Sequence, residues 1–320
     1  MHNASKTCQH LMTPLTLTRR LLSGLVLGLV ITGCSASYNG ERLFWKAQQV
    51  QAAALKNKKE ANQLTAAETA KIVNAYAVVI QRVPGSIWAA QSQGTIGSLY
   101  ATQKQYDKAR EAYGLVVQNF NQYQGVALAA RVAMAKTYEL EQRWNEAMKW
   151  YNEIADLYPW SSAGLSAPLR IAVMYEKHQA PELATQSYER AVGMYTKRIP
   201  DAPTPEMAFI VKGYLALAYQ RLSQWDLAVT TLEELLKARA GINRPLALLT
   251  LATIYDVKLH VPEKAIAAYT TFTQEFPNHP LGKVAKAQLG RLAALKTDST
   301  SAAPMTPAIP AVPLPSTATR

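Results

Sequence analysis

The sequence of 320 residues contains only two cysteines, Cys8 and Cys34. Two thiols are too few for a disulfide framework or a cysteine-rich zinc site. Charged residues make up 18% of the chain and hydrophobic residues 49%, so the composition as a whole excludes a disordered or fibrous protein. Runs of β-branched residues are few while alanine is abundant. This combination favours an all-α fold.

Motifs that carry catalysis are also missing. The chain has no glycine-rich phosphate loop, and none of its five histidines pairs with another at i, i+4 or with a cysteine as a metal ligand. No serine lies in the strand–turn–helix elbow of a hydrolase. The sequence therefore predicts no catalytic residue, no metal ligand and no enzyme activity. An enzyme that acts on envelope polymers through a pair of helical carboxylates is the alternative from another class.

The N-terminal segment has the order of a secretory signal. Arg19 and Arg20 precede the apolar run 21–31, and the tripeptide Thr-Gly-Cys follows and ends at Cys34. An apolar run of about 11 residues is too short to cross a hydrocarbon core of about 30 Å as a helix. We therefore expect residues 1–33 to be a removable signal rather than a membrane span.

The four residues ITGC, which end at Cys34, resemble the lipobox of bacterial lipoproteins. The resemblance implies diacylglycerol on the Cys34 sulfur, cleavage after Gly33 and a lipidated tether over 34–39. Two or more acyl chains anchor a protein firmly to a membrane. Ser35, in place of Asp, implies an outer-membrane location facing mainly the periplasm in lipoproteins of enterobacterial type. The alternatives are a plain secretory signal with an incidental cysteine and a start of the chain at Met12.

The formal net charge is +12, and removal of residues 1–33 lowers it to +9 because Lys6, Arg19 and Arg20 are lost. A basic chain is attracted to lipid headgroups, acidic proteins and acidic polymers. The lysines and arginines are spread along the chain without interleaved aromatics, so we expect no nucleic acid. Contact with an anionic polymer or peptidoglycan is a further alternative.

Small and aromatic residues recur together through the middle of the chain. The first set lies 38, 37, 44 and 37 residues apart: Ala109, Ala147, Ala184, Ala228 and Ala265. Four residues after each comes a large side chain: Tyr113, Tyr151, Tyr188, Leu232 and Tyr269. Nine residues before each, or ten in the last unit, comes a tyrosine: Tyr100, Tyr138, Tyr175, Tyr219 and Tyr255. Three residues before these comes another small set: Gly97, Ala135, Ala172, Ala216 and Ala252.

This pattern resembles the tetratricopeptide repeat over roughly residues 70–295. The resemblance implies an all-α, right-handed superhelical solenoid of antiparallel helix hairpins. Small residues let two helices approach closely, and neighbouring hairpins must stack because none buries its own apolar face. A proline-rich stretch at 198–206 predicts the loop that lengthens one period to 44 residues, while Pro159 and Pro277 are expected to end second helices.

The solenoid is predicted to cover 40–296, with about five repeats between two flanking elements. Helices in 40–58 and 61–84 form an N-terminal hairpin, and a capping box, Thr65-x-x-Glu68, starts the second of them. A capping helix is expected at the other end, over 281–296. The Ser, Thr, Ala and Pro of 297–320 cannot form a core and predict a disordered tail.

Three tryptophans lie at the ends of predicted helices. Trp144 and Trp225 hold the same position, three residues before a phased alanine, which predicts a packing role at the hairpin turn. Trp160 follows a helix-ending proline and is expected outside the core.

Arrays of this type bind extended segments or partner helices on a concave face lined mostly by first helices. Projection of the pattern predicts these groove residues: Ser98, Thr102, Lys136, Glu139, Leu140, Val173, Lys177, Leu217, Gln220 and Arg221. Lys136, Lys177 and Arg221 favour an acidic ligand.

The repeat style and the lipobox together are similar to the lipoprotein subunit of the outer-membrane β-barrel assembly machinery. The resemblance implies a lipid-anchored adaptor that binds protein partners in the cell envelope. Repeat lipoproteins of pilus assembly, polysaccharide export or cell-wall coordination look alike and are alternatives.

Overall fold

The computed structural model describes residues 38–58, 60–237 and 243–297. Every regular element in these ranges is helical, which confirms the predicted all-α fold. None of the described helices is long and apolar enough to cross a membrane. The chain forms two compact units, Met1–Glu141 and Gln142–Arg320, and each is described by itself.

The predicted ends of the chain lie mostly outside the described residues. This applies to the signal 1–33, to Cys34 and to the tail from residue 298. Residues 38 and 39, which the sequence assigned to the tether, are already helical. At the other end, the last helix includes Thr297, one residue more than predicted.

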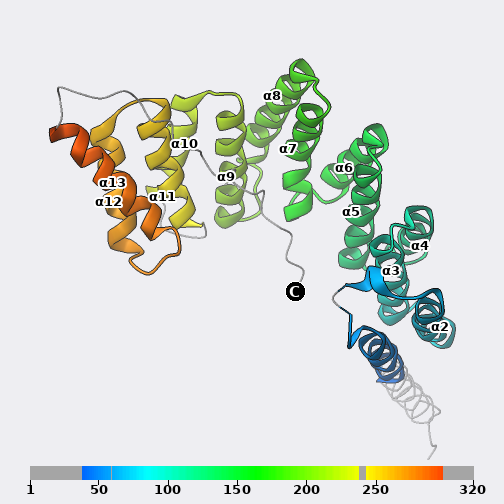
Figure 1. Ribbon diagram of the computed structural model, residues 1–320. Helices are drawn as coiled ribbons and strands as arrows, with labels where there is room; N and C mark the ends of the chain where they lie inside the picture. The colour runs from blue at the N-terminus through cyan, green and yellow to red at the C-terminus, as the bar shows by residue number, and fades with distance from the viewer. Residues whose placement is uncertain (1–37, 59, 238–242, 298–320) are drawn as a thin grey trace, which may run out of the picture. The chain divides into compact units, whose positions relative to one another are not determined.

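The first unit is a stack of helices in chain order (Figure 1). It consists of the helical residues 38–55, the 3-10 turn η1 Ala61–Gln63, α2 Ala66–Arg82, α3 Ile87–Thr102, α4 Tyr106–Asn119 and α5 Gln124–Leu140. Consecutive helices from α2 to α5 contact one another, and α3 also contacts α5. First helices are therefore neighbours in this unit, as a repeat stack requires.

The predicted N-terminal hairpin is present with shorter helices, because the first ends at residue 55 and α2 covers Ala66–Arg82 instead of 61–84. Thr65 accepts a hydrogen bond from the Glu68 backbone N–H, and the Glu68 carboxylate accepts one from the Thr65 N–H, so the capping box forms. Helical residues 38–55 pack on α2 and α3 through Phe44, whose ring lies 5.8 Å from that of Tyr76. The Tyr76 hydroxyl donates to Gln51 at 2.6 Å.

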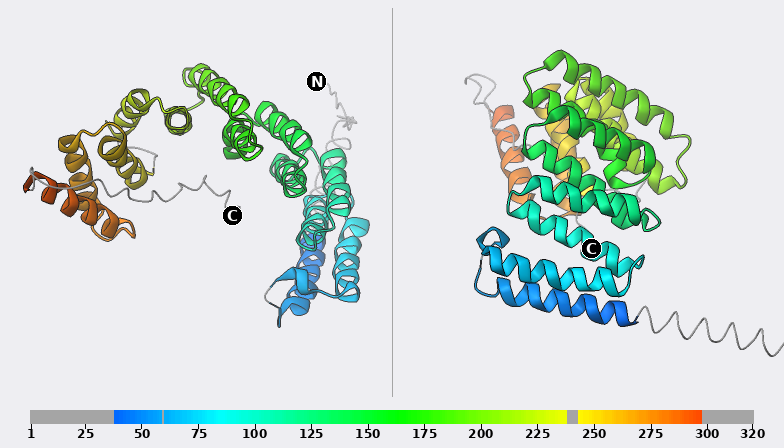
Figure 2. Two further views of the ribbon diagram at one scale, coloured as in Figure 1. Left: turned by 45° about the horizontal axis from the view of Figure 1, so that its top comes forward. Right: turned by 90° about the vertical axis from the view of Figure 1, so that its right-hand side faces the viewer.

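The second unit is also a stack of helices in chain order. Its elements are α6 Trp144–Leu157, α7 Ser162–Lys177, α8 Pro181–Arg198, α9 Pro205–Arg221, α10 Trp225–Lys237, α11 Arg244–Thr253, the π-helical turn η2 Ile254–Lys258, α12 Pro262–Glu275 and α13 Gly282–Thr297. Consecutive helices contact each other from α6 to α13, and α7 contacts α9 (Figure 2). The predicted capping helix is α13.

The phased positions behave as the repeat pattern predicts. All five alanines of the first set are buried, and so are the four tyrosines and the leucine that follow them. The matching small residues of the first helices are buried too. The closest approach is at Gly97, where a Cβ would lie 2.6 Å from the Tyr113 ring. The small residues thus provide the close helix contact on which the hairpins depend.

The turn between the two helices of each repeat has a shared backbone geometry. One residue in each turn has a left-handed φ between 53° and 60°: Lys104, Gln142, Gln179, Ser223 and His260. Each lies five residues before the phased alanine. The next backbone N–H donates to the carbonyl of the first-helix tyrosine at Gln105, Ala180, Gln224 and Val261, as from Gln105 to Tyr100 at 2.9 Å. This is the Schellman closure of a helix.

Two irregular spacings in the repeat pattern also have structural causes. The 44-residue period arises from α8, which has 18 residues, and from the loop after Arg198, so the predicted loop is confirmed, except that Pro205 already starts α9. In the last repeat, the extra residue before the alanine coincides with the π-helical turn at Ile254–Lys258. A π turn accommodates one more residue than an α turn.

Two of the three tryptophans pack on the end of a neighbouring first helix. The Trp144 ring meets that of His178 edge-on at 5.2 Å, and the Lys258 ammonium lies 5.1 Å from the Trp225 ring. Each tryptophan therefore packs on the end of the next repeat's first helix. Trp160 is not one of the buried core residues, as expected, although its partly buried side chain packs against the core formed by α7, α8 and α9.

Candidate functional site

The predicted groove residues lie on first helices, divided between the two units. Ser98 and Thr102 are on α3, and Lys136 and Glu139 are on α5. In the second unit Lys177 is on α7, and Gln220 and Arg221 are on α9. We call the α3–α5 set the first face and the α7–α9 set the second face. Within each face the two first helices contact each other.

The first face is mostly polar and only partly engaged with the rest of the fold. Ser98 and Thr102 are exposed, and Ser98 accepts a hydrogen bond from the Tyr113 hydroxyl at 3.2 Å. Burial raises the pKa of Tyr113, so this hydroxyl stays protonated and can donate. Lys136 is exposed and Glu139 is half-buried. The face therefore presents hydroxyls and one cation beside a carboxylate.

The second face contains a chain of polar contacts across three helices. Arg221 on α9 lies 3.9 Å from the Glu176 carboxylate on α7, and Glu176 accepts a hydrogen bond from the Tyr188 hydroxyl of α8 at 3.0 Å. Burial, and then the negative charge of Glu176, raise the pKa of Tyr188. Arg221 and Glu176 are exposed, so their pair contributes little to stability and is accessible to a ligand.

The apolar members of the predicted groove differ in exposure. Val173 and Leu217 are half-buried and pack against the core of α7, α8 and α9, so only part of each side chain faces outward. Leu140 is 64% exposed at the end of α5. Gln220 is half-buried, and its amide donates to the Ala216 carbonyl at 3.2 Å. Some of the predicted groove residues are therefore exposed, and others pack against the core.

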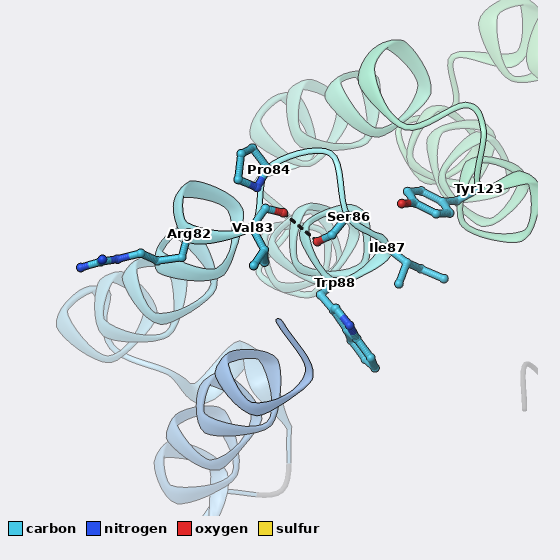
Figure 3. Close-up of a pocket in the computed structure, with 7 residues that line it drawn as sticks. All are labelled: Arg82, Val83, Pro84, Ser86, Ile87, Trp88 and Tyr123. Atoms are coloured by element: carbon cyan, nitrogen blue, oxygen red, sulfur yellow. Dashed lines mark hydrogen bonds between the residues drawn. The ribbon is translucent and has the colours of Figure 1, made fainter. Parts of the chain in front are cut away.

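Sequence reasoning missed two pockets of the first unit, neither of which contains a predicted groove residue. One pocket of about 380 Å³ lies at the α2–α3 turn and is lined by Arg82, Val83, Pro84, Ser86, Ile87, Trp88 and Tyr123 (Figure 3). The Ser86 hydroxyl donates to the Val83 carbonyl at 2.7 Å, and the Tyr123 hydroxyl donates to the Gly85 carbonyl at 2.9 Å. Its polar groups hold the turn together and do not converge on a common point.

The other pocket is larger, about 550 Å³, and more polar. Its lining comes from η1, α2 and the α3–α4 turn: Asn62, Leu64, Ala66, Thr69, Ala70, Val73, Asn74, Tyr100, Gln103, Gln105 and Lys108. The Gln103 amide donates to Thr69 at 2.5 Å, and the Lys108 ammonium lies 5.5 Å from the Tyr100 ring. Two amide-rich turns about 40 residues apart form it, which no local pattern reveals.

The described part of the chain contains no group of three or more His, Cys, Asp or Glu side chains placed to hold a metal ion. His178 and His260 are exposed at turns, and His279 is half-buried, with its ring nitrogen accepting from the Leu281 N–H at 3.2 Å. The arrangement offers recognition chemistry: hydrogen bonds, cations and apolar surface.

Comparison with known proteins agrees with the repeat pattern. A family model described as tetratricopeptide repeat matches residues 214–239. These residues include α10 and the end of α9, so one hairpin turn carries the match. None of the curated proteins compared with the chain matches it.

Several solved structures of repeat proteins are similar in arrangement. The C-terminal part of a tetratricopeptide-containing protein from Cytophaga hutchinsonii is 14% identical, covers 78% of this chain and 98% of its own, and has a TM-score of 0.47. A thermophilic tetratricopeptide protein from Thermus thermophilus is 17% identical and covers 65% of this chain and 100% of its own, with a TM-score of 0.42. The pilF protein of Pseudomonas aeruginosa is 13% identical and covers 78% and 99%, with a TM-score of 0.39.

Proposed function

We propose that this chain is a lipid-anchored adaptor of the bacterial cell envelope that binds protein partners along its first-helix faces. The observation that carries the proposal is the arrangement of the first helices. On each face the two first helices contact each other, bury their small residues and leave polar and basic side chains exposed. Helical arrays with such faces bind extended segments or helices.

The charges of the two faces favour an acidic partner segment. Lys136 on the first face and Arg221 on the second are exposed, and Lys177 adds a third cation near the end of α7. Exposed charges of this kind steer association and set partner choice more than they add affinity. Reversal of Lys136 or Arg221 to Glu is therefore expected to slow association and to reduce its dependence on salt.

Site-specific photocrosslinking in the parent bacterium tests the faces directly. A photoreactive residue replaces Lys136 or Arg221 on first helices, and matched controls replace Glu111 and Arg190, which are exposed on the second helices α4 and α8. We expect the same discrete protein adducts from both first-helix positions and none from the controls. Equal crosslinking from all four positions would show that the faces are not the binding surface.

The lipid anchor is a separate part of the proposal and has its own test. Cys34→Ser removes the sulfur that would carry diacylglycerol, so the variant is expected to lose detergent-phase partition and processing sensitive to a lipoprotein signal-peptidase inhibitor. Met1→Ala with Met12 intact tests the alternative start without affecting the lipid. Unchanged processing of Cys34→Ser would refute the anchor and leave a plain secretory signal.

The machine that the adaptor serves is identified by its crosslinked partners. The resemblance in repeat style favours outer-membrane β-barrel assembly, and pilus, polysaccharide-export or cell-wall proteins are the other outcomes. Net charge favours a second candidate function, adhesion to peptidoglycan or another anionic polymer through the excess of lysine and arginine. Cosedimentation with peptidoglycan that weakens steeply with salt, without protein adducts, would support it.

A further inference from the structure

The helical residues 38–55 have an outward face that the fold does not use. Leu43, Phe44, Ala47, Val50 and Ala54 of this stretch belong to the core of the first unit. On the opposite side, Tyr38 is 70% exposed and Trp45 is 57% exposed. In the part of the chain that the structure describes, these two are the only aromatic residues among the exposed large hydrophobic side chains.

The two aromatic side chains share one side of the helix. They are seven positions apart, which is about two turns and about 10.5 Å along the helix axis. Arg42, one turn after Tyr38, is exposed on the same side, and Lys46 follows one turn later. Glu41 is the one exposed acidic residue between Tyr38 and Lys46. We call Tyr38, Arg42, Trp45 and Lys46 the aromatic–basic face.

The start of this helix is held firmly on the unit. Gly40 is buried against Trp88 of α3, so closely that a Cβ at Gly40 would lie 2.5 Å from the indole ring. Phe44 packs on the same ring, with the two ring centres 5.5 Å apart. The aromatic–basic face therefore has a fixed orientation relative to the first unit and cannot turn inward to bury its aromatic side chains.

We propose that the aromatic–basic face lies on the headgroup layer of the membrane that carries the anchor, and so orients the first unit at the bilayer. This inference rests on the lipid on Cys34 proposed above. Tyr38 comes four positions after Cys34, and a chain of that length reaches at most about 14 Å. The face thus starts within reach of the headgroup layer.

The chemistry of the face matches that layer. Tyr and Trp are enriched where membrane meets water, because their rings are apolar and their polar ends stay hydrated. Arg and Lys beside them pair with anionic headgroups. A single tethering point would leave the unit free to rotate, whereas a second contact two helical turns away restricts it.

Fluorescence quenching in reconstituted vesicles tests the contact. The full lipidated chain is placed in vesicles of phosphatidylethanolamine and phosphatidylglycerol whose lipids are brominated near the headgroup, and tryptophan emission is measured. We expect clear quenching of the wild type and loss of most of it in Trp45→Phe, which keeps an aromatic ring at the site. Trp225→Phe, in the second unit, is the matched control and should quench like the wild type.

The outcomes separate the contact from the anchor. Vesicle flotation of the wild type shows whether the chain is anchored. If it floats and Trp45→Phe quenches as much as the wild type, the contact is refuted and the anchor stands. If it does not float, the anchor fails and the contact falls with it. If quenching is absent and a dimer seen in detergent is lost in Trp45→Ser, a second copy covers the face and the proposal is overturned.

Discussion

Replacement of Gly164 by alanine is expected to destabilise the second unit, although alanine normally strengthens a helix. Gly164 lies in the first turn of α7, and a Cβ there would lie 2.0 Å from the carbonyl oxygen of Tyr158. That oxygen accepts hydrogen bonds from the backbone N–H and the hydroxyl of Ser161 at 3.0 and 2.9 Å. It cannot move aside without losing them.

The turn around this oxygen is fixed from a third helix as well. Arg198 of α8 donates to the carbonyls of Ala155 and Pro159 at 3.0 and 3.4 Å, and the buried Tyr195 hydroxyl donates to the Leu165 carbonyl at 2.5 Å. These contacts hold both sides of the α6–α7 turn. The added methyl group must therefore push the two helices apart.

The magnitude follows from two opposed effects. Overpacking costs about 1–3 kcal/mol, and a rigid backbone atom places this site at the upper end. The gain in helix propensity from Gly to Ala offsets about 1 kcal/mol. We expect a net loss of about 2 kcal/mol for Gly164→Ala. Gly193 of α8 is the matched control, because nothing lies within 4 Å of its added Cβ. Gly193→Ala should therefore gain about 1 kcal/mol.

Thermal and urea unfolding followed by far-ultraviolet circular dichroism measures both variants. The difference of about 3 kcal/mol corresponds to melting temperatures on the order of 8 °C apart for a unit of this size. The opposite signs are the decisive feature. A Gly164→Ala variant as stable as Gly193→Ala would mean that the α6–α7 turn yields freely, and the close-approach argument would be wrong.

Three further predictions concern the turns, the N-terminal hairpin and alkaline pH. Ser223→Gly should stabilise the second unit by about 0.5–1 kcal/mol in urea unfolding, because a left-handed φ strains residues with a Cβ; a loss would contradict the Schellman assignment. Thr65→Ala removes the acceptor for the Glu68 N–H and should cost about 1 kcal/mol of first-unit stability, with Thr65→Ser close to wild type. Burial is the main cause that raises the pKa of Tyr188 and Tyr195. Unfolded tyrosines ionise near pH 10, so stability should be complete below about that pH and fall as pH rises above it, with tyrosinate absorbance appearing together with unfolding; ionisation of all tyrosines in a chain that is still helical would contradict it.

Sequence reasoning succeeded where one local rule applies many times. The phased alanines and their large partners predicted the helix hairpins that each unit contains, because close helix approach needs a small residue at the same place in each repeat. The capping box was predictable because it involves only Thr65 and Glu68, three residues apart. For the same reason Pro159 marked a helix end. Each of these features depends on neighbours in sequence.

The sequence did not predict features that join residues far apart in the chain, or positions that several residue types can occupy. The left-handed turn residues are Lys, Gln, Gln, Ser and His, so no glycine marks them. The Arg221–Glu176 pair links residues 45 apart on different first helices, and many carboxylates were equivalent candidates in the sequence. The division into units after Glu141 falls between the two helices of one repeat, where the phase of the repeat is regular.

The last repeat differs from the others in the spacing between its first-helix tyrosine and its phased alanine. Tyr255 precedes its alanine by ten residues rather than nine, and the π-helical turn accommodates the additional residue. Within that turn Asp256 is buried, and its carboxylate accepts hydrogen bonds from Arg291 of α13 at 2.5 Å and from Tyr269 at 3.4 Å. A buried carboxylate without a cation is strongly unfavourable. The capping helix therefore supplies the partner that allows the π turn to carry a charge. The additional residue between Tyr255 and its alanine creates the π turn that contains Asp256. Arg291, 35 residues after Asp256, supplies the cation for it, so the two features belong together at the last repeat.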